Sequence, residues 1–262
     1  MTHLVVLIPV YRNQAGLDRT LASLSGARGS FDTILVDDGS PQPLFAPPRL
    51  GEGLDVTTLR LEKNRGIAGA LNHGLRHILA RSYSYIARLD AGDTIAPERF
   101  ERQLEFLEAH PDCSAVSSFV DFVDARQGFL FRYRAPCTHA KILRRLRLNN
   151  CLVHSGSMLR SSVLRELGVY REDLPGAEDY ELFLRMARRY SLAVLPEVLT
   201  RCEYSLDGLS VGGRRQQQWE RVKLQLRYFD AASPFSFYGI ARTLVAMLAP
   251  HRAVFRLKTL RG

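Results

Sequence analysis

The sequence of 262 residues is poor in cysteine, and its four cysteines form no C-x-x-C pair. They stand far apart, at Cys113, Cys137, Cys151 and Cys202. This spacing predicts neither a structural zinc site nor a disulfide framework. Reduced thiols in the cytosol are therefore the simpler expectation.

The sequence also lacks a long hydrophobic run near its start. The apolar stretch from Leu4 to Val10 is interrupted by Pro9 and is far shorter than the ~20 residues of a membrane span. It has neither the basic lead nor the small-residue cleavage site of a signal peptide. We therefore expect a cytoplasmic protein.

Acidic residues are outnumbered, with 27 Asp and Glu against 36 Lys and Arg, a net charge of +9. Such a balance favours an anionic partner, which could be a nucleotide, a nucleic acid or an anionic lipid surface. The hydrophobic fraction of 46% is ordinary for a globular chain. The length allows one large domain or two small ones.

Strand and helix patterns alternate in the first half of the chain. Buried strands are predicted at 4–8, 33–36, 56–61 and 83–89, and helices at 15–25, 66–80 and 97–110. This alternation predicts an α/β fold with a mostly parallel, Rossmann-like central sheet flanked by helices. Ligands of such sheets bind at the carboxyl ends of the strands.

The second half mixes the two element types less regularly. It predicts an antiparallel strand pair at 114–123 and 129–133, a strand at 192–199, and helices at 144–148, 178–189 and 216–229. No repeat or low-complexity linker divides the chain. We predict one domain over residues 1–210, with halves 1–110 and 111–210, followed by a helical, basic C-terminal extension over 211–262.

Two acidic turns follow predicted strands. Asp90 and Asp93 stand in one, and Asp37 and Asp38 in the other. Carboxylates at a strand end can hold a divalent cation together with substrate phosphates, or can accept hydrogen bonds from a nucleoside. Asp and Gly are also common turn formers, so each turn alone has a structural explanation.

Three further segments carry candidate site residues. Arg65 precedes a helix that also holds Asn72, and a helix N-terminus attracts anions. Glu178 and Asp179 open another helix, where they can cap it or serve as a general base. His154 lies in a predicted loop and could bind substrate or be structural.

Taken in chain order, these segments resemble those of the inverting glycosyltransferases of family 2, which have the A-type glycosyltransferase fold. The matching stretches are 8–13, 34–40, 64–66 with Ala70, Asn72 and Gly74, 87–93 with 97–100, 154–157 and 177–182. Each is weak alone, whereas their order and spacing are specific. The resemblance covers roughly residues 4–210.

The resemblance implies a role for each candidate. Pro9, Tyr11 and Asp38 would line the nucleoside pocket, and Arg65, Asn72 and Asp90 would lie at the nucleotide. His154 and Glu178 would be on the acceptor side. Asp179 would be the catalytic base that deprotonates the acceptor hydroxyl, so that the anomeric configuration inverts.

The acid motif departs from the family pattern, because Gly92 stands where an aspartate is usual. Asp90 and Asp93 are therefore the candidate ligands of a Mg²⁺ or Mn²⁺ ion that would neutralise the departing diphosphate. The donor would be a UDP- or dTDP-sugar, and the acceptor a glycan or lipid-linked hydroxyl of bacterial surface polysaccharide or lipopolysaccharide synthesis.

Some alternatives stay open at this point. The segment from Phe235 to Leu260 mixes apolar and basic residues, as peripheral membrane segments do, but could equally be a helix packed on the domain. A sugar-1-phosphate nucleotidyltransferase would also use an α/β nucleotide fold, although no glycine-rich loop follows the first strand. A nucleic-acid-binding protein would suit the charge but leaves the acidic turns unexplained, so we expect no nucleic acid partner.

Overall fold

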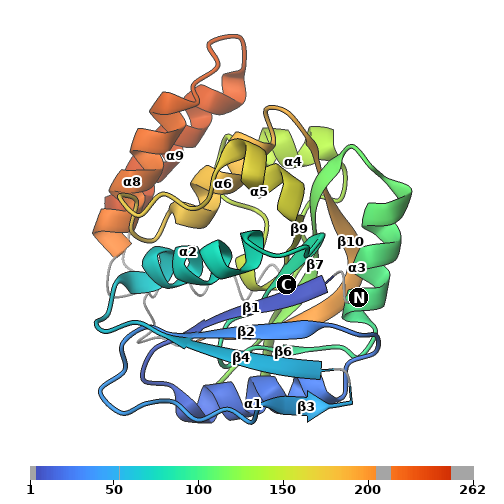
Figure 1. Ribbon diagram of the computed structural model, residues 1–262. Helices are drawn as coiled ribbons and strands as arrows, with labels where there is room; N and C mark the ends of the chain where they lie inside the picture. The colour runs from blue at the N-terminus through green and yellow to red at the C-terminus, as the bar shows by residue number, and fades with distance from the viewer. Residues whose placement is uncertain (1–3, 53, 205–213, 249–262) are drawn as a thin grey trace.

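The computed structural model describes residues 4–52, 54–204 and 214–248. The strands are β1 (Leu4–Val10), β2 (Asp32–Asp37), β3 (Arg49–Gly51), β4 (Leu54–Arg60), β5 (Tyr85–Arg88), β6 (Thr94–Ile95), β7 (Cys113–Val123), β8 (Phe129–Tyr133), β9 (Met158–Arg160) and β10 (Ser191–Glu203). They form one sheet in the order β3-β4-β2-β1-β5-β9-β7-β10-β6, and β8 pairs with β7 beside this path. The predicted central sheet is confirmed (Figure 1).

Helices flank the sheet. They are α1 (Gln14–Ser25), α2 (Gly66–Leu79), α3 (Arg99–Ala109), α4 (His139–Leu146), α5 (Ser161–Leu167), α6 (Glu178–Met186), α8 (Arg214–Arg227) and α9 (Pro234–Leu248). A short 3₁₀ turn covers His154–Gly156. α1 and α2 lie on opposite faces of the sheet (Figure 1).

The first half of the chain forms the parallel part of the sheet. β1 pairs in parallel with β2 and β5, and β2 pairs in parallel with β4. Every residue of β1 is buried, as its unbroken apolar sequence predicts for a strand covered on both faces. The carboxyl ends of these strands therefore meet at one edge of the sheet, where the acidic turns lie.

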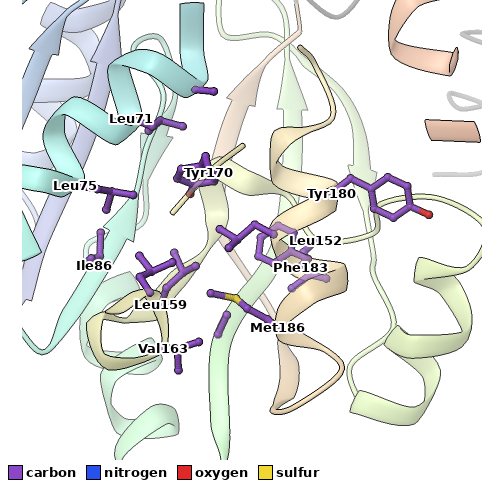
Figure 2. Close-up of a cluster of buried hydrophobic side chains, with 14 of the residues drawn as sticks. Leu71, Leu75, Ile86, Leu152, Leu159, Val163, Tyr170, Tyr180, Phe183 and Met186 are labelled. Atoms are coloured by element: carbon purple, nitrogen blue, oxygen red, sulfur yellow. The ribbon is translucent and has the colours of Figure 1, made fainter. Parts of the chain in front are cut away.

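Two hydrophobic clusters fill the space on either side of the sheet. Along β1, Val5 and Leu7 belong to one cluster, whereas Val6 and Ile8 belong to the other, as the alternation of a strand requires. The first cluster lies under α2, α4, α5 and α6, and the second under α1 and α3. Figure 2 shows Leu71 and Leu75 on one side of the first cluster and Phe183 and Met186 on the other.

The second half departs from several predicted boundaries: α6 ends at Met186 rather than at 189, α8 is shifted by two residues from the predicted 216–229, and two further elements differ more. The helix predicted at 144–148 begins earlier, at His139, and buries Ile142 and Leu146, one turn apart. The strand predicted at 192–199 extends to Glu203, because a register shift near Pro196, which has no N–H to donate, lets pairing with β7 resume. The predicted antiparallel pair, β7 with β8, is confirmed. β9 and α5 were not predicted.

The C-terminal extension folds as a helical hairpin of α8 and α9, which stands at one side of the molecule (Figure 1). Arg147 anchors it, since its guanidinium pairs with Asp230 at 2.6 Å and donates to Ser233 Oγ at 2.9 Å. The predicted boundary at residue 210 and the predicted basic segment after residue 248 lie outside the described residues. None of the helices in the described ranges has the length and hydropathy that a membrane span requires.

Candidate active site

The ends of β1 and β2 are tied to the start of α2 through Asp38. Its backbone N–H donates to the carbonyl of Val10 at 2.9 Å, and its carboxylate accepts from the N–H of Arg65 at 2.8 Å. Burial raises the pKa of Asp38, and the N–H groups of Arg65 and Gly66 oppose that rise. The side chain is 4% exposed and caps α2, a structural role that the sequence did not reveal. Its contact with a nucleoside stays a prediction.

Tyr11 follows β1 with its ring 41% exposed, and the guanidinium of Arg12 stacks over it at 5.6 Å. The N–H of Arg12 donates to Ser40 Oγ, which holds this turn against the acidic turn after β2. Pro9 is buried within β1 opposite Val36. Of the three residues predicted to line the nucleoside pocket, Pro9, Tyr11 and Asp38, only Tyr11 is exposed.

Asn72 is buried in α2 and fully engaged within the protein. Its side-chain amide donates to the carbonyl of Tyr170 at 2.9 Å and to Glu172 at 3.0 Å, and its oxygen accepts from the N–H of Tyr170. Arg65 also pairs with Glu172, at 2.8 Å. Asn72 therefore fixes the segment at 170–172 beside the N-terminus of α2, while Arg65 remains 41% exposed there.

Asp90 is partly exposed in the turn after β5, and a buried arginine holds its carboxylate. The guanidinium of Arg88, which is 1% exposed, pairs with the carboxylate of Asp90, which is 40% exposed. Arg88 also donates to the carbonyls of Leu7 and Leu89. The N–H of Asp90 donates to Ser155 Oγ at 2.9 Å, so the 3₁₀ turn at 154–156 holds the acidic turn as well.

Asp93 has a different environment from Asp90. It is 6% exposed, and its Oδ1 accepts from the N–H of Glu203 at 2.9 Å. Burial, together with the charge of Asp90, raises the pKa of Asp93 to about 7, while hydrogen bonds from Ser155 and Cys202 oppose the rise. Asp93 therefore supports the turn from inside the protein. Its metal-ligand role stays a prediction.

Gly92 has a backbone that few other residues would tolerate. Its φ is +116°, and a Cβ at this position would lie 3.3 Å from Glu203 Oε2. Its N–H donates to Thr20 Oγ1, which in turn donates to the carbonyl of Asp93. Glycine at this motif position thus fits a tight turn that α1 holds on one side and Glu203 borders on the other.

Glu178 and Asp179 lie in the first turn of α6, where Glu178 is buried and Asp179 is half-buried. Asp179 Oδ2 accepts from Asn150 Nδ2 at 2.8 Å. Burial raises the pKa of Asp179, the charge of Arg221 on α8 lowers it, and the charge of Asp90 raises it. Burial, reinforced by the charge of Asp179, raises the pKa of Glu178 to about 7.

His154 and Tyr170 form a contact near these acids. His154 Nε2 lies 2.7 Å from the Tyr170 hydroxyl, and the two rings pack edge to face. Burial and the charge of Arg88 lower the pKa of His154 well below its usual value, so the ring is neutral at physiological pH. Tyr170 lies within the electrostatic reach of Asp90, Glu178 and Asp179. The structure thus brings these predicted site residues together.

A divalent ion fits this site only in part. Among the described residues, no group of three or more His, Cys, Asp or Glu side chains is arranged to hold a metal. Asp90 offers a partly exposed carboxylate, the hard oxygen donor that Mg²⁺ and Mn²⁺ prefer. One or two protein carboxylates completed by substrate phosphates are a common arrangement for Mg²⁺, and Asp90 fits that arrangement.

The model of the family described as Glycosyl transferase family 2 matches residues 5–168. The chain belongs to this family. The resemblance read from the motifs is confirmed, and the chain is a glycosyltransferase. The amylovoran biosynthesis glycosyltransferase AmsE of Erwinia amylovora is 30% identical over 230 residues, which cover 86% of this chain and 83% of AmsE. An uncharacterized glycosyltransferase of Haemophilus influenzae is 29% identical over 210 residues, which cover 76% and 75% of the two chains.

Solved structures confirm the A-type fold of this family 2 member. S. aureus TarS 1–349 in complex with UDP-GlcNAc has a TM-score of 0.68 at 15% identity, over 93% of this chain and 72% of that one. The mannosyltransferase PcManGT from Pyrobaculum calidifontis, in complex with GDP-Man and Mn²⁺, has a TM-score of 0.64 at 18% identity, over 94% and 69%. At these identities the likeness concerns the fold alone.

Several residues near the acids of this family 2 enzyme were not predicted from the sequence. Arg88 carried a usable signal, because a charged residue in an otherwise apolar strand must find buried partners. Asn150 and Arg221 carried none, since nothing local indicates that they approach Asp179 from a loop and from the C-terminal hairpin.

Proposed function

We propose that this enzyme transfers a sugar from a UDP- or dTDP-linked donor to a hydroxyl of a glycan or lipid-linked acceptor, with inversion, in bacterial surface polysaccharide or lipopolysaccharide synthesis. The similarity to AmsE supports the polysaccharide context. Complexes of two structural neighbours with UDP-GlcNAc and GDP-Man support a nucleotide-sugar donor and add GDP to the nucleotides to be tested. The reaction would take place on the cytoplasmic side.

The single observation that supports the proposal is that Asp90 and Asp179 lie near enough to each other to interact electrostatically. Asp90 lies in the turn after β5, Asp179 lies in the first turn of α6, and the negative charge of Asp90 raises the pKa of Asp179. An inverting transfer needs one group on the side of the leaving diphosphate and a base on the opposite side of the same sugar. These two acids supply one residue for each.

Asp179 acts as the base in this proposal. It would accept the proton of the acceptor hydroxyl as that oxygen attacks the anomeric carbon from the face opposite the diphosphate. Its pKa is raised by burial, which makes it a stronger proton acceptor than an exposed aspartate. Asn150, donating to Oδ2, would orient the carboxylate. Glu178 and His154 would border the acceptor.

The nucleotide would lie along the ends of β1 and β2. Tyr11 offers an exposed ring for the base, Asp38 and Pro9 shape the turn beneath it, and Arg65 offers a cation at the N-terminus of α2. Asn72 would contribute by holding Glu172 beside Arg65.

Asp90, with Asp93 behind it, would hold Mg²⁺ or Mn²⁺. When bound, the ion would neutralise the charge that develops on the departing diphosphate. Arg88 would limit the movement of the Asp90 carboxylate, because its guanidinium pairs with that carboxylate and also donates to two backbone carbonyls.

A thermal-shift panel tests the donor class. UDP, dTDP and GDP, and their sugars, are each added with and without Mn²⁺, and with EDTA as a control. We expect one nucleotide to raise the melting temperature in the presence of Mn²⁺ and much less in EDTA. No stabilisation by any nucleotide sugar under either condition would contradict the proposal.

A further inference from the structure

Helix α9 docks on the body of the protein through its small residues. Ser236 and Thr243 are each 4% exposed, and Gly239 is buried between them. A Cβ on Gly239 would lie 2.1 Å from the carbonyl oxygen of Arg147, so only glycine allows this approach. The three residues recur at helical spacing and form one stripe. This stripe faces the protein.

The opposite side of α9 is apolar and exposed. Its exposed fractions are 57% for Phe237, 60% for Tyr238, 43% for Leu244 and 67% for Val245. A surface helix normally buries its apolar side and exposes its polar side. In α9 this arrangement is reversed, so its outward face is available to an apolar partner.

Exposed apolar side chains are concentrated on this hairpin. Eight of the eleven large hydrophobic residues that are exposed among the described residues belong to α8, α9 or the turn between them. Trp219 and Leu226 of α8 are 50% and 57% exposed, and Phe229 packs against Phe237 at 4.9 Å. A patch of this kind on one projecting element indicates an interaction surface (Figure 1).

The net positive charge of residues 214–262 favours an anionic partner. Ten Lys or Arg residues and only two acids lie between positions 214 and 262. Both acids are already paired, Glu220 with Lys223 and Asp230 with Arg147. An exposed apolar face on a segment rich in basic residues matches the acyl boundary and head groups of an anionic bilayer. A symmetric contact with a second copy would instead oppose two positive surfaces.

We infer that the outward face of α9 docks on the surface of an anionic lipid bilayer. Phe237 and Val245 enter the acyl boundary, and the basic side chains of the hairpin lie at the head groups. The hairpin also borders the acceptor side of the site, because the charge of Arg221 acts on Asp179. Docking would therefore present Asp179 to a lipid-linked acceptor, a consequence that rests on the proposed function.

Vesicle flotation of the full chain tests this inference. Vesicles of phosphatidylcholine are compared with vesicles that contain phosphatidylglycerol, for the wild type, Val245→Asp and the matched control Phe129→Asp. Phe129 is 62% exposed on β8, so the control adds the same charge at an exposed apolar site away from the hairpin. Far-UV circular dichroism and nucleotide thermal shifts on the same samples report folding and donor binding separately.

We expect the wild type and Phe129→Asp to float with phosphatidylglycerol vesicles, less so at high salt, and Val245→Asp to lose about tenfold or more in partition. Equal binding by Val245→Asp, or no binding by the wild type, would overturn the inference. A dimer of the wild type that Val245→Asp converts to a monomer, without vesicle binding, would assign the face to a second copy.

A fluorescence probe covers the case in which Val245→Asp does not fold. Trp219 is the single tryptophan of the chain, so a Trp219→Phe background allows Phe237→Trp to report from α9 alone. Adding phosphatidylglycerol vesicles should shift its emission to shorter wavelength, and brominated lipids should quench it. An unchanged spectrum would contradict insertion of this face. Donor-dependent thermal shifts that persist in that case would leave the proposed transfer chemistry intact.

Discussion

The buried guanidinium of Arg88 pairs with the partly exposed carboxylate of Asp90. The same guanidinium donates to the carbonyl of Leu7, within β1, and to that of Leu89, just after β5. One side chain thus connects the central strands to the acid that we propose faces the donor. This connection gives the acidic turn a fixed orientation before any ligand arrives.

Replacing Arg88 should therefore affect both the site and the fold. Arg88→Met removes the guanidinium donor from the Leu89 carbonyl and one of the two donors to the Leu7 carbonyl, which the N–H of Leu89 still serves. We expect it to lower the free energy of unfolding by about 1–3 kcal/mol. It should also weaken Mn²⁺ binding in the presence of nucleotide, measured by titration calorimetry. Arg88→Lys should recover part of the stability but less of the Mn²⁺ affinity, because an ammonium cannot span the same partners.

Arg102→Met is the control for Arg88, since Arg102 forms an exposed ion pair with Glu197. It should change neither property measurably. Mn²⁺ affinity that is unchanged in Arg88→Met would show that Arg88 is structural only.

The backbone conformation of Gly92 predicts that substitutions at this position are strained. At φ +116°, any residue with a Cβ is strained, so Gly92→Ala should lower the free energy of unfolding by about 1–3 kcal/mol. Gly92→Asp should cost more, because its carboxylate would lie near Glu203. Denaturant unfolding gives both values. Gly51→Ala, at a glycine without a positive φ, should cause no such loss, and equal stability of all three variants would refute the strain.

The raised pKa of Glu178 predicts that the stability of the protein depends on pH. Burial raises the pKa of Glu178 to about 7 in the folded state, so the folded protein holds this proton more tightly than the unfolded chain does. The contribution of Glu178 to the free energy of unfolding is therefore fully present at low pH and is lost as the pH rises through about 7. Glu178→Gln removes this loss. We therefore expect the variant to gain stability relative to the wild type between pH 5 and 8, on the order of 2 kcal/mol.

Thermal unfolding across this pH range measures the gain. Glu108→Gln, at an exposed position on α3, removes the same charge as a control and should follow the wild-type curve. A Glu178→Gln curve parallel to that of the wild type would mean that Glu178 is not protonated in the folded protein near neutral pH.

The sequence predicted the regular elements that repeat a clear pattern. β1 and β2 are unbroken apolar runs, and α2 carries its apolar residues along one side, so their type and order could be read directly. β9 could not, because three residues are too few to show an alternation. The true extent of α4 was hidden because only Ile142 and Leu146 are buried in it.

The site residues that lie at strand ends could be predicted from the sequence. The residues that reach the site only through tertiary contacts could not. Asp90 and Asp179 could be identified from motif order, but their mutual approach depends on how α6 packs over the sheet. Asn72 shows the limit of motif reading, since the structure engages its amide with Tyr170 and Glu172. Its partners lie about a hundred residues away, where local patterns carry no information.

The central claim is that Asp179 serves as the base of the transfer, and the variant Asp179→Asn tests it most directly. Transfer rate and donor affinity are measured side by side, with Asp173→Asn, an exposed neighbour paired with Arg171, as the control. The account predicts that Asp179→Asn slows transfer by about 10²–10⁴-fold while donor affinity changes little, and that the control keeps both. Near-normal turnover by Asp179→Asn would contradict it.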